Sequence, residues 1–591
     1  MTNNNRSFYI YLSISLLVTL YYGVWFYYFV FNQDYVVQDD ARQHVVWLQR
    51  FIDPELFPRD LIADYFQNLA PIGFKSLYLL VAKLGLEPIL LAKILPPILG
   101  ILTTIYIYLF TLQILPIPIT GCISSLLINQ IIWLNDDLVS ATPRAFIYPL
   151  FAAFLYYLSI KSLIPCLILM LLQGLFYPHI LLIEMVILSL RLLIIKPEFT
   201  RKFKIQLTTL KQPYIWWLAG LIVTAIALYP ITQKPPELAT TVTAEQMRQM
   251  PEFNLGGRSP FFGGGWFNYW FVGSSGFSLP LFPTIVWGGL ILPWLLKTKL
   301  PIIKLITNKI TILQQVTVAS LVMFILAHIL LPRLHLPSRY TYHTLRFMLA
   351  ISTAIVITVI INSIKTKLNQ KLKHKIPFEL SEKIKLTTII LFSLIIIIVP
   401  ALPLIFIDGY QDWKIGNKDQ EIYQYLSQQP KDILVASLAK KANNIPAFAQ
   451  RSILIGGEFA MAYHPAYHNQ IKQKTVDLLQ AQYSSDITVL KSFIAKYQIN
   501  YFILDKTAFY PEYFSQKKWL INSSWQNKTK KVIKQLKSKN TPVLTKFIKP
   551  CRIISTTDLI LLDAACIKQT NISPVSLNPP PLKYYDLRQK H

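Results

Sequence analysis

Two adjacent carboxylates, Asp39 and Asp40, follow the first long apolar segment of the chain. The residues after them repeat at helical spacing, so one carboxylate could cap a short helix, an interaction worth about 1 kcal/mol. Alternatively, one of them is a general base that faces an acceptor hydroxyl at the membrane surface. Partial burial beside a second carboxylate would make that base stronger. Arg42, one turn further on, could hold a phosphate oxygen through its planar guanidinium group.

Other ionisable side chains recur in the polar segments between apolar runs. Each has an ordinary explanation, as a solvated turn, a hydrogen-bonded histidine or a headgroup anchor. Each also has a functional one, as the lining of a cavity shared with the acidic pair. The candidates for phosphate binding, besides Arg42, are Arg144, Arg339 and His343, and those for lining a substrate cavity are His44, Asp136, Asp137, His179, Arg258 and Trp266.

Segment 231–277 is a long loop that contains glycine runs followed by aromatic residues, Trp266 among them. Such a loop is typical of a functional lid. Its aromatic rings could stack on a sugar or a lipid chain, and an interfacial aromatic belt explains them equally well. No cofactor is predicted, because the Asp136–Asp137 pair without further ligands does not establish a divalent-metal site.

The composition places these residues in a membrane protein. The chain has 591 residues, of which 53% are apolar and 15% charged, and its mean hydropathy is +0.40. Soluble domains carry roughly 25% charged residues, so an ordinary cytosolic enzyme is excluded, and the apolar content excludes disorder. We expect about eleven membrane-spanning helices, at about 8–31, 89–114, 119–134, 145–160, 162–176, 178–195, 214–230, 278–296, 312–332, 345–363 and 386–407.

The positive charge of the chain, formally +28, gathers in three connections between these runs, 196–213, 297–310 and 363–385. Excess lysine and arginine marks the cytoplasmic side of a membrane. Membrane topology therefore explains the positive charge, and no nucleic-acid partner is predicted. The N-terminus is then cytoplasmic, and the first loop, 32–87, lies on the outer face with most other polar clusters. We expect two short amphipathic helices in this loop, with Asp60 as the N-cap of the second. Ionisable residues that converge on one face favour chemistry there over a transport path.

From Asp408 onward the composition becomes that of a soluble domain. The runs DILVASL, SILIGG and NYFILDK predict buried strands, and the stretch 476–497 predicts a helix, so we expect an α/β sheet with parallel pairs. VLTKFI, RIIST and LILLDA predict added antiparallel strands, and Cys551 and Cys566 could pair. Gly456-Gly457-Glu458 is too short to predict a phosphate-binding loop. We interpret this region, 408–591, as an accessory extracytoplasmic domain after a membrane domain at 1–407.

The long first loop with its acidic pair, the number of spans and the outer C-terminal domain resemble the GT-C superfamily of membrane glycosyltransferases. Asp39-Asp40-Ala41-Arg42 is similar to the acidic–acidic–x–basic signature of its aminoarabinose and protein mannosyltransferase branches. The stretches ATPRAFIYPL, LPSRYTYH and NNIPAFAQRS resemble bacterial membrane proteins grouped with the superfamily. The resemblance implies a catalytic carboxylate at Asp39 and a phosphate-side residue at Arg42. Asp40 stands where those branches usually have glutamate, so the choice between the two carboxylates stays open.

The leading hypothesis is therefore a GT-C-type glycosyltransferase of the bacterial inner membrane. It would transfer a hexose or pentose from a polyprenyl-phosphate carrier to a glycan, lipid or protein acceptor on the outer face. Two alternatives stay open: a lipid or glycan transporter, and a non-catalytic assembly protein with the same fold. Replacing Asp39 or Asp40 should abolish activity only under the first hypothesis.

Overall fold

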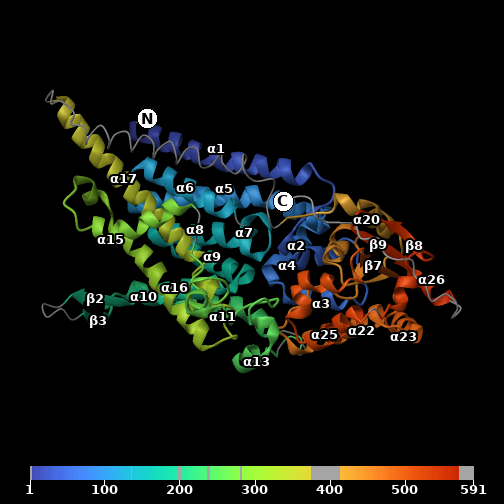
Figure 1. The fold of residues 1–591 in the computed structure, drawn as a ribbon. Coiled ribbons are helices and arrows are strands. Elements are labelled where there is room, and N and C mark those ends of the chain that lie inside the picture. The colour runs from blue at the N-terminus through green and yellow to red at the C-terminus, as the bar shows by residue number, and fades with distance from the viewer. Residues whose placement is uncertain are drawn as a thin grey trace.

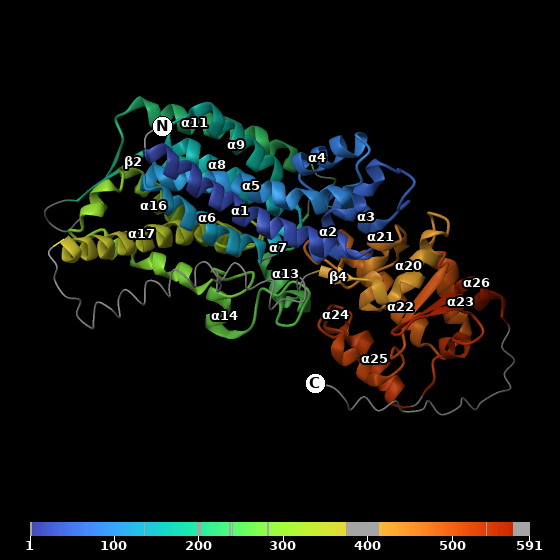
Figure 2. The ribbon, with the colours of Figure 1, turned by 90° about the horizontal axis from the view of Figure 1, so that it is seen from above.

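Helices dominate the computed structural model, which describes residues 3–134, 136–197, 203–233, 235, 238, 240–279, 283–373, 413–538 and 540–570. The long helices lie side by side in one part of the molecule, and a small sheet lies at the other end (Figure 1). The view from above shows the same division (Figure 2). The helical part contains α1 (Asn3–Phe31), α5 (Pro88–Ile114), α6 (Pro118–Trp133), α8 (Ile147–Ser159), α9 (Leu163–Phe176), α10 (Pro178–Leu190), α11 (Lys211–Thr232), α16 (Thr311–Ile329) and α17 (Thr344–Lys373).

Five described helices are long and apolar enough to cross a membrane, and four shorter apolar helices accompany them. The chain is thus a multi-pass membrane protein, as its composition predicts. The count of eleven spans is not confirmed. The predicted span 386–407 lies outside the described residues. The antiparallel pair of β2 (Leu193–Pro197) and β3 (Phe203–Leu207) begins within the predicted span 178–195 and continues into the predicted connection 196–213.

The predicted helix over 278–296 is shorter and less regular than expected, since the described apolar helix there is Thr284–Leu295. This segment forms η4 (Thr284–Ile291), a 3₁₀-helix, and then one α-helical turn, α15 (Leu292–Leu295). Pro293 lies in the first turn of α15, where its missing N–H costs nothing, but it could not continue a preceding α-helix. Gly289 brings η4 against α17, because a Cβ atom there would lie 2.7 Å from the carbonyl oxygen of Leu349.

The first loop is a compact set of short elements between α1 and α5: β1 (Val36–Gln38), α2 (Asp39–His44), η1 (Val46–Phe51), α3 (Leu61–Leu69) and α4 (Ile72–Lys83). The predicted cap of α3 is confirmed, since the Asp60 carboxylate accepts hydrogen bonds from the backbone N–H groups of Ile62 and Ala63, at 2.8 and 3.0 Å. β1 pairs with β4 (Trp413–Ile415), which comes from the far end of the sequence. The loop is therefore tied to the C-terminal region by a backbone ladder.

The C-terminal region is built on a five-stranded sheet with the order β6-β5-β7-β9-β8. The three predicted buried strands are confirmed: β5 (Leu434–Ser437) pairs in parallel with β6 (Ser452–Ile453) and with β7 (Tyr501–Asp505). The predicted antiparallel additions are β9 (Leu559–Asp563) and β8 (Arg552–Ser555). The predicted Cys551–Cys566 pair is a disulfide.

Two predictions for this region need correction. The VLTKFI segment is not a strand but a 3₁₀-helix, η12 (Val543–Phe547), which starts after Pro542. The predicted helix over 476–497 is two helices, α22 (Pro465–Tyr483) and α23 (Ile487–Tyr497). The break between them is explained by Asp486, whose carboxylate caps α23 by accepting from the N–H of Thr488.

Candidate functional site

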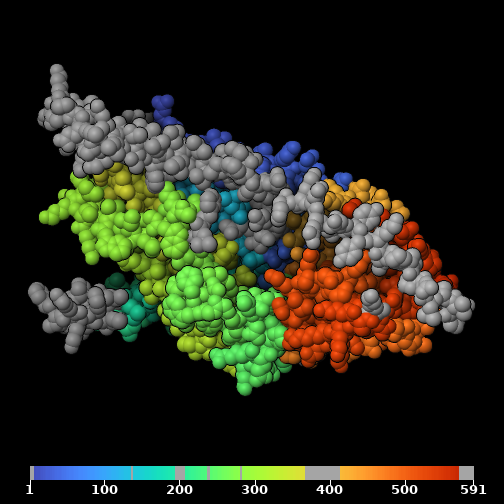
Figure 3. Space-filling view, in the orientation of Figure 1, coloured from blue at the N-terminus to red at the C-terminus, as the bar shows by residue number. Residues whose placement is uncertain are grey.

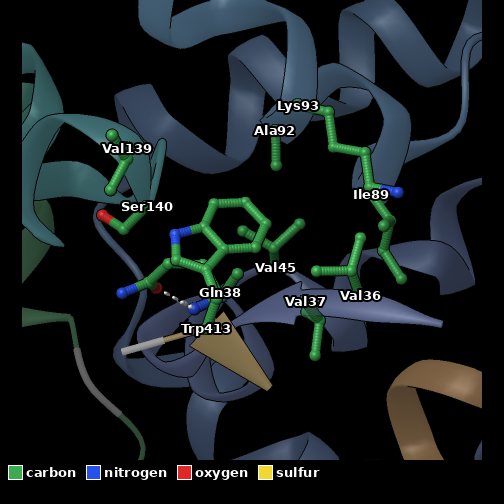
Figure 4. A pocket seen from close by; sticks show the side chains of 11 residues that line it. Val36, Val37, Gln38, Val45, Ile89, Ala92, Lys93, Val139, Ser140 and Trp413 are labelled. Carbon is green, nitrogen blue, oxygen red and sulfur yellow. Dashed lines mark hydrogen bonds between the residues drawn. The ribbon is translucent and has the colours of Figure 1, made fainter. Parts of the chain in front are cut away.

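The acidic pair occupies the first two positions of α2, where β1 ends. Gln38 is the N-cap of this helix, and its side chain accepts from the N–H of Ala41 at 3.1 Å. Capping by Asp39 or Asp40 is therefore a wrong explanation, and both carboxylates are available for other contacts. Behind the pair lies a small, mainly apolar pocket in which the Trp413 indole lies between residues of β1 and the helical part (Figure 4). This packing fixes the backbone from which the carboxylates project.

Asp40 belongs to an ion network that is otherwise supplied by the helical part. Its carboxylate contacts the guanidinium of Arg144, on η2 (Pro143–Phe146). Arg144 in turn lies 3.0 Å from Asp137, a fully buried carboxylate on α7 (Asp136–Val139). The first loop and a segment about a hundred residues later thus meet through opposite charges. The sequence predicted that their side chains share a cavity but not that they form an ion pair.

Asp137 organises the inner half of this network. It accepts a hydrogen bond from the Tyr148 hydroxyl at 3.0 Å, and Arg346 lies 3.3 Å away. The guanidinium carbon of Arg346 also lies 3.4 Å from the centre of the Tyr342 ring, a cation–π contact. His343 is fully buried, with its Nδ1 3.2 Å from the Tyr148 hydroxyl. Its Nε2 has no hydrogen-bond partner among the described residues.

Positive charge is concentrated around Asp40. Arg339 lies close enough to Arg144 and His44 to lower the pKa of both. Burial, assisted by Arg339, lowers the pKa of Arg144 to about 10 and that of His44 to about 4. At neutral pH, Arg144 is still charged and His44 is neutral. Two neighbouring guanidinium groups repel each other, and an anion placed between them would relieve that repulsion.

Asp39 belongs to a second network, which faces the C-terminal region. Its carboxylate contacts Arg42 and lies 3.5 Å from the ammonium group of Lys414 on β4. Arg42 is 2% exposed and donates to Asn444 at 2.8 Å. Arg42 also lies 3.5 Å from Glu458. These partners hold the Arg42 guanidinium in place, so its predicted contact with a phosphate would require it to leave them.

Glu458 connects three separate parts of the chain, although it is not among the site residues that the sequence predicts. Its carboxylate contacts Arg42 and Gln43 of the first loop and, at 2.6 Å, Arg258 of the long loop. The backbone oxygen of Glu458 also accepts from Arg258 at 2.8 Å. The signal that could have found it was the Gly456-Gly457-Glu458 run directly after a strand.

The remaining predicted residues do not all lie near the two ion networks. The His179 ring lies 5.0 Å from Tyr177 and 5.5 Å from His335, and Tyr177 lies 6.0 Å from His343, so His179 borders the Asp137 network. Trp266 is 71% exposed and contacts neither network. The side chain of Asp136 lies outside the described part of the structure. Within the described ranges, no group of three or more His, Cys, Asp or Glu residues could hold a metal ion.

Neither a family model nor a curated protein matches the chain. Solved structures do. One is the Archaeoglobus fulgidus oligosaccharyltransferase tethered to an acceptor peptide, at 12% identity and a TM-score of 0.48, over 89% of this chain and 72% of that chain. The same archaeal enzyme, AglB, in complex with an inhibitory peptide and a dolichol-phosphate, matches at 12% identity and a TM-score of 0.47. That match covers 89% of this chain and 72% of that chain.

The arabinofuranosyltransferase AftD from Mycobacteria is also similar, at 12% identity and a TM-score of 0.43, over 85% of this chain and 35% of that one. Both enzymes are membrane glycosyltransferases of the GT-C superfamily, which this sequence resembles. Because all three TM-scores lie below 0.5, the function proposed next rests on the side chains of this chain.

Proposed function

We propose that this protein is a GT-C-type membrane glycosyltransferase that uses a polyprenyl-phosphate-linked sugar. The supporting observation is the Asp40–Arg144–Asp137 network, in which a partly exposed carboxylate meets the half-buried guanidinium of Arg144, which the fully buried Asp137 contacts in turn. An acceptor hydroxyl needs a base, and a phosphate leaving group needs positive charge, within one site. On the orientation that the basic connections predict, this site lies at the outer face of the bacterial inner membrane.

In the proposed reaction, the acceptor hydroxyl gives its proton to Asp40 as its oxygen bonds to the anomeric carbon of the sugar. The bond between that carbon and the phosphate oxygen breaks, and the electron pair stays on the phosphate. Arg144 and Arg339 stabilise the charge that develops there. The products are the glycosylated acceptor and polyprenyl phosphate.

Asp40 is the better candidate for the base, although the family signature places that role at Asp39. The Asp39 carboxylate is occupied by its contacts with Arg42 and Lys414, which hold it toward the C-terminal region. Asp40 contacts Arg144, a residue that the donor phosphate would also attract. Binding of the donor would therefore draw Arg144 away from Asp40 and free the Asp40 carboxylate to accept a hydrogen bond from the acceptor hydroxyl. Arg42 then acts as a positioning residue that fixes the start of α2.

The test is Asp40→Asn in protein reconstituted in lipid nanodiscs, with a panel of polyprenyl-phosphate hexoses and pentoses as donors and release of polyprenyl phosphate as the readout. We expect the rate to fall by about 10²–10⁴, the usual contribution of a general base. Asp39→Asn should lower it far less. Equal rates for wild type and Asp40→Asn would refute the proposal, and a loss confined to Asp39→Asn would move the base to that residue.

A further inference from the structure

The helix α14 (Gly265–Phe271) presents aromatic rings to the outside of the molecule. None of its residues is buried, and the side chains of Trp266, Phe267 and Phe271 are 71%, 64% and 40% exposed. The green surface of the loop that carries α14 lies against the orange C-terminal region in the space-filling view (Figure 3). Several large exposed aromatics on one short helix form an apolar surface that normally has a partner.

This surface is held rigidly against the end of a membrane-crossing helix. The Tyr269 hydroxyl lies 3.3 Å from Nδ1 of His328 on α16, and the Trp270 ring lies 5.1 Å from the His328 ring. Nε2 of His328 lies 2.9 Å from the backbone oxygen of Ser275, which follows α14. Tyr269 and Trp270 thus face inward, and the neighbouring rings of α14 must face outward.

α14 lies at the C-terminal end of α16, because its residues Tyr269 and Trp270 contact His328 there. At the same end of α16, the apolar side chains of Ile325 and Ile329 are 55% and 70% exposed. A helix of this length and hydropathy crosses the bilayer, and its exposed apolar residues then face lipid chains. An aromatic surface at the end of such a helix lies at the depth of the lipid headgroups, where tryptophan is enriched.

We infer that α14 is an interfacial anchor whose partner is the lipid bilayer itself. Trp266, Phe267 and Phe271 insert at the boundary between headgroups and acyl chains, and they hold the loop of residues 240–279 at the membrane surface. The same loop is fixed to the C-terminal region at its other end. Ser524 donates to Glu252 through its backbone N–H at 2.6 Å and its hydroxyl at 2.9 Å, and Arg258 contacts Glu458. The loop therefore fastens the C-terminal region to the membrane beside the two ion networks.

Site-directed spin labelling tests this inference without any assay of activity. The chain is suited to it, because Cys551 and Cys566 form a disulfide and Cys122 and Cys166 are buried. Nitroxides are placed at Trp266→Cys and Phe267→Cys, with Glu245→Cys on the exposed side of α13 (Ala244–Gln249) as the matched control in the same loop. The full chain is studied in nanodiscs of phosphatidylethanolamine and phosphatidylglycerol.

We expect molecular oxygen, which concentrates in lipid, to relax the labels at 266 and 267 severalfold more than a water-soluble nickel chelate does. The order should reverse at 245. Labels at 266 and 267 that respond like the control would overturn the inference, because α14 would then face water. Labels reached by neither reagent would also overturn it, because protein would then cover the surface.

A second measurement leaves the fold almost unchanged. Brominated acyl chains quench the fluorescence of nearby indoles only. The difference in tryptophan fluorescence between wild type and Trp266→Phe, which is the emission of Trp266, should therefore be smaller in brominated than in ordinary lipids. If brominated and ordinary lipids give the same difference between these two proteins, Trp266 is not in the bilayer.

Discussion

The Asp137→Asn substitution should destabilise the protein strongly, although it changes only one functional group. Asp137 is fully buried, 3.0 Å from Arg144 and 3.3 Å from Arg346. Asparagine preserves the shape and can still accept from Tyr148, but it leaves the two guanidinium groups without this counter-charge. Removing one partner from a buried ion pair costs about 3–5 kcal/mol, because the remaining charge stays out of water. Arg144 keeps Asp40 and Arg346 keeps its contact with Tyr342, so we expect the lower end, about 3 kcal/mol.

The loss would be measured as the change in unfolding free energy by denaturation in mixed micelles. The matched control is Asp53→Asn, which removes the same charge from a contact of 2.6 Å with Lys431, where both side chains are about a third exposed or more. An exposed pair contributes about 0–1 kcal/mol, so the control should barely change stability. Adding Arg346→Gln to Asp137→Asn should recover part of the loss. If Asp137→Asn costs no more than Asp53→Asn, the network does not hold buried charge in the way described.

Two further changes probe other parts of the site. Glu458→Gln weakens the contact with Arg258, a hydrogen bond to a charged group worth about 1.5–3 kcal/mol. Amides of residues 252–262 should then exchange about tenfold or more faster in hydrogen-exchange mass spectrometry, and unchanged exchange would contradict this. The pKa of His44, lowered to about 4 by burial and by Arg339, lies below the value of about 6.5 in the unfolded chain. The contribution of neutral His44 to the free energy of unfolding should therefore be fully present above pH 6.5 and fall by about 2 kcal/mol by pH 5. The His44→Gln variant should lack this pH dependence. The same pH dependence in the variant would exclude His44 as its source.

The sequence alone predicted most of the fold, because the signals involved are local. Apolar runs predict helices wherever they are long, and the runs around β5, β7 and β9 predict strands because buried strands are short and bounded by turn residues. The prediction of 278–296 gave an apolar helix but not its 3₁₀ geometry, because hydropathy does not report backbone geometry. Prolines and the close approach of Gly289 to α17 decide that geometry.

Some features of the candidate site could likewise be predicted from the sequence, and others were decided only by the tertiary structure. Residue types in the sequence selected Asp39, Asp40, Arg144 and His343, since unpaired charge beside membrane segments is costly and signals a function. Only the tertiary structure separated the two carboxylates into different networks. It did so because β4 returns to pair with β1 and brings Lys414 to Asp39, while α7 and η2 bring Arg144 to Asp40. The role of Glu458 is likewise a property of the fold, because its partners lie about 200 and 415 residues away in the chain.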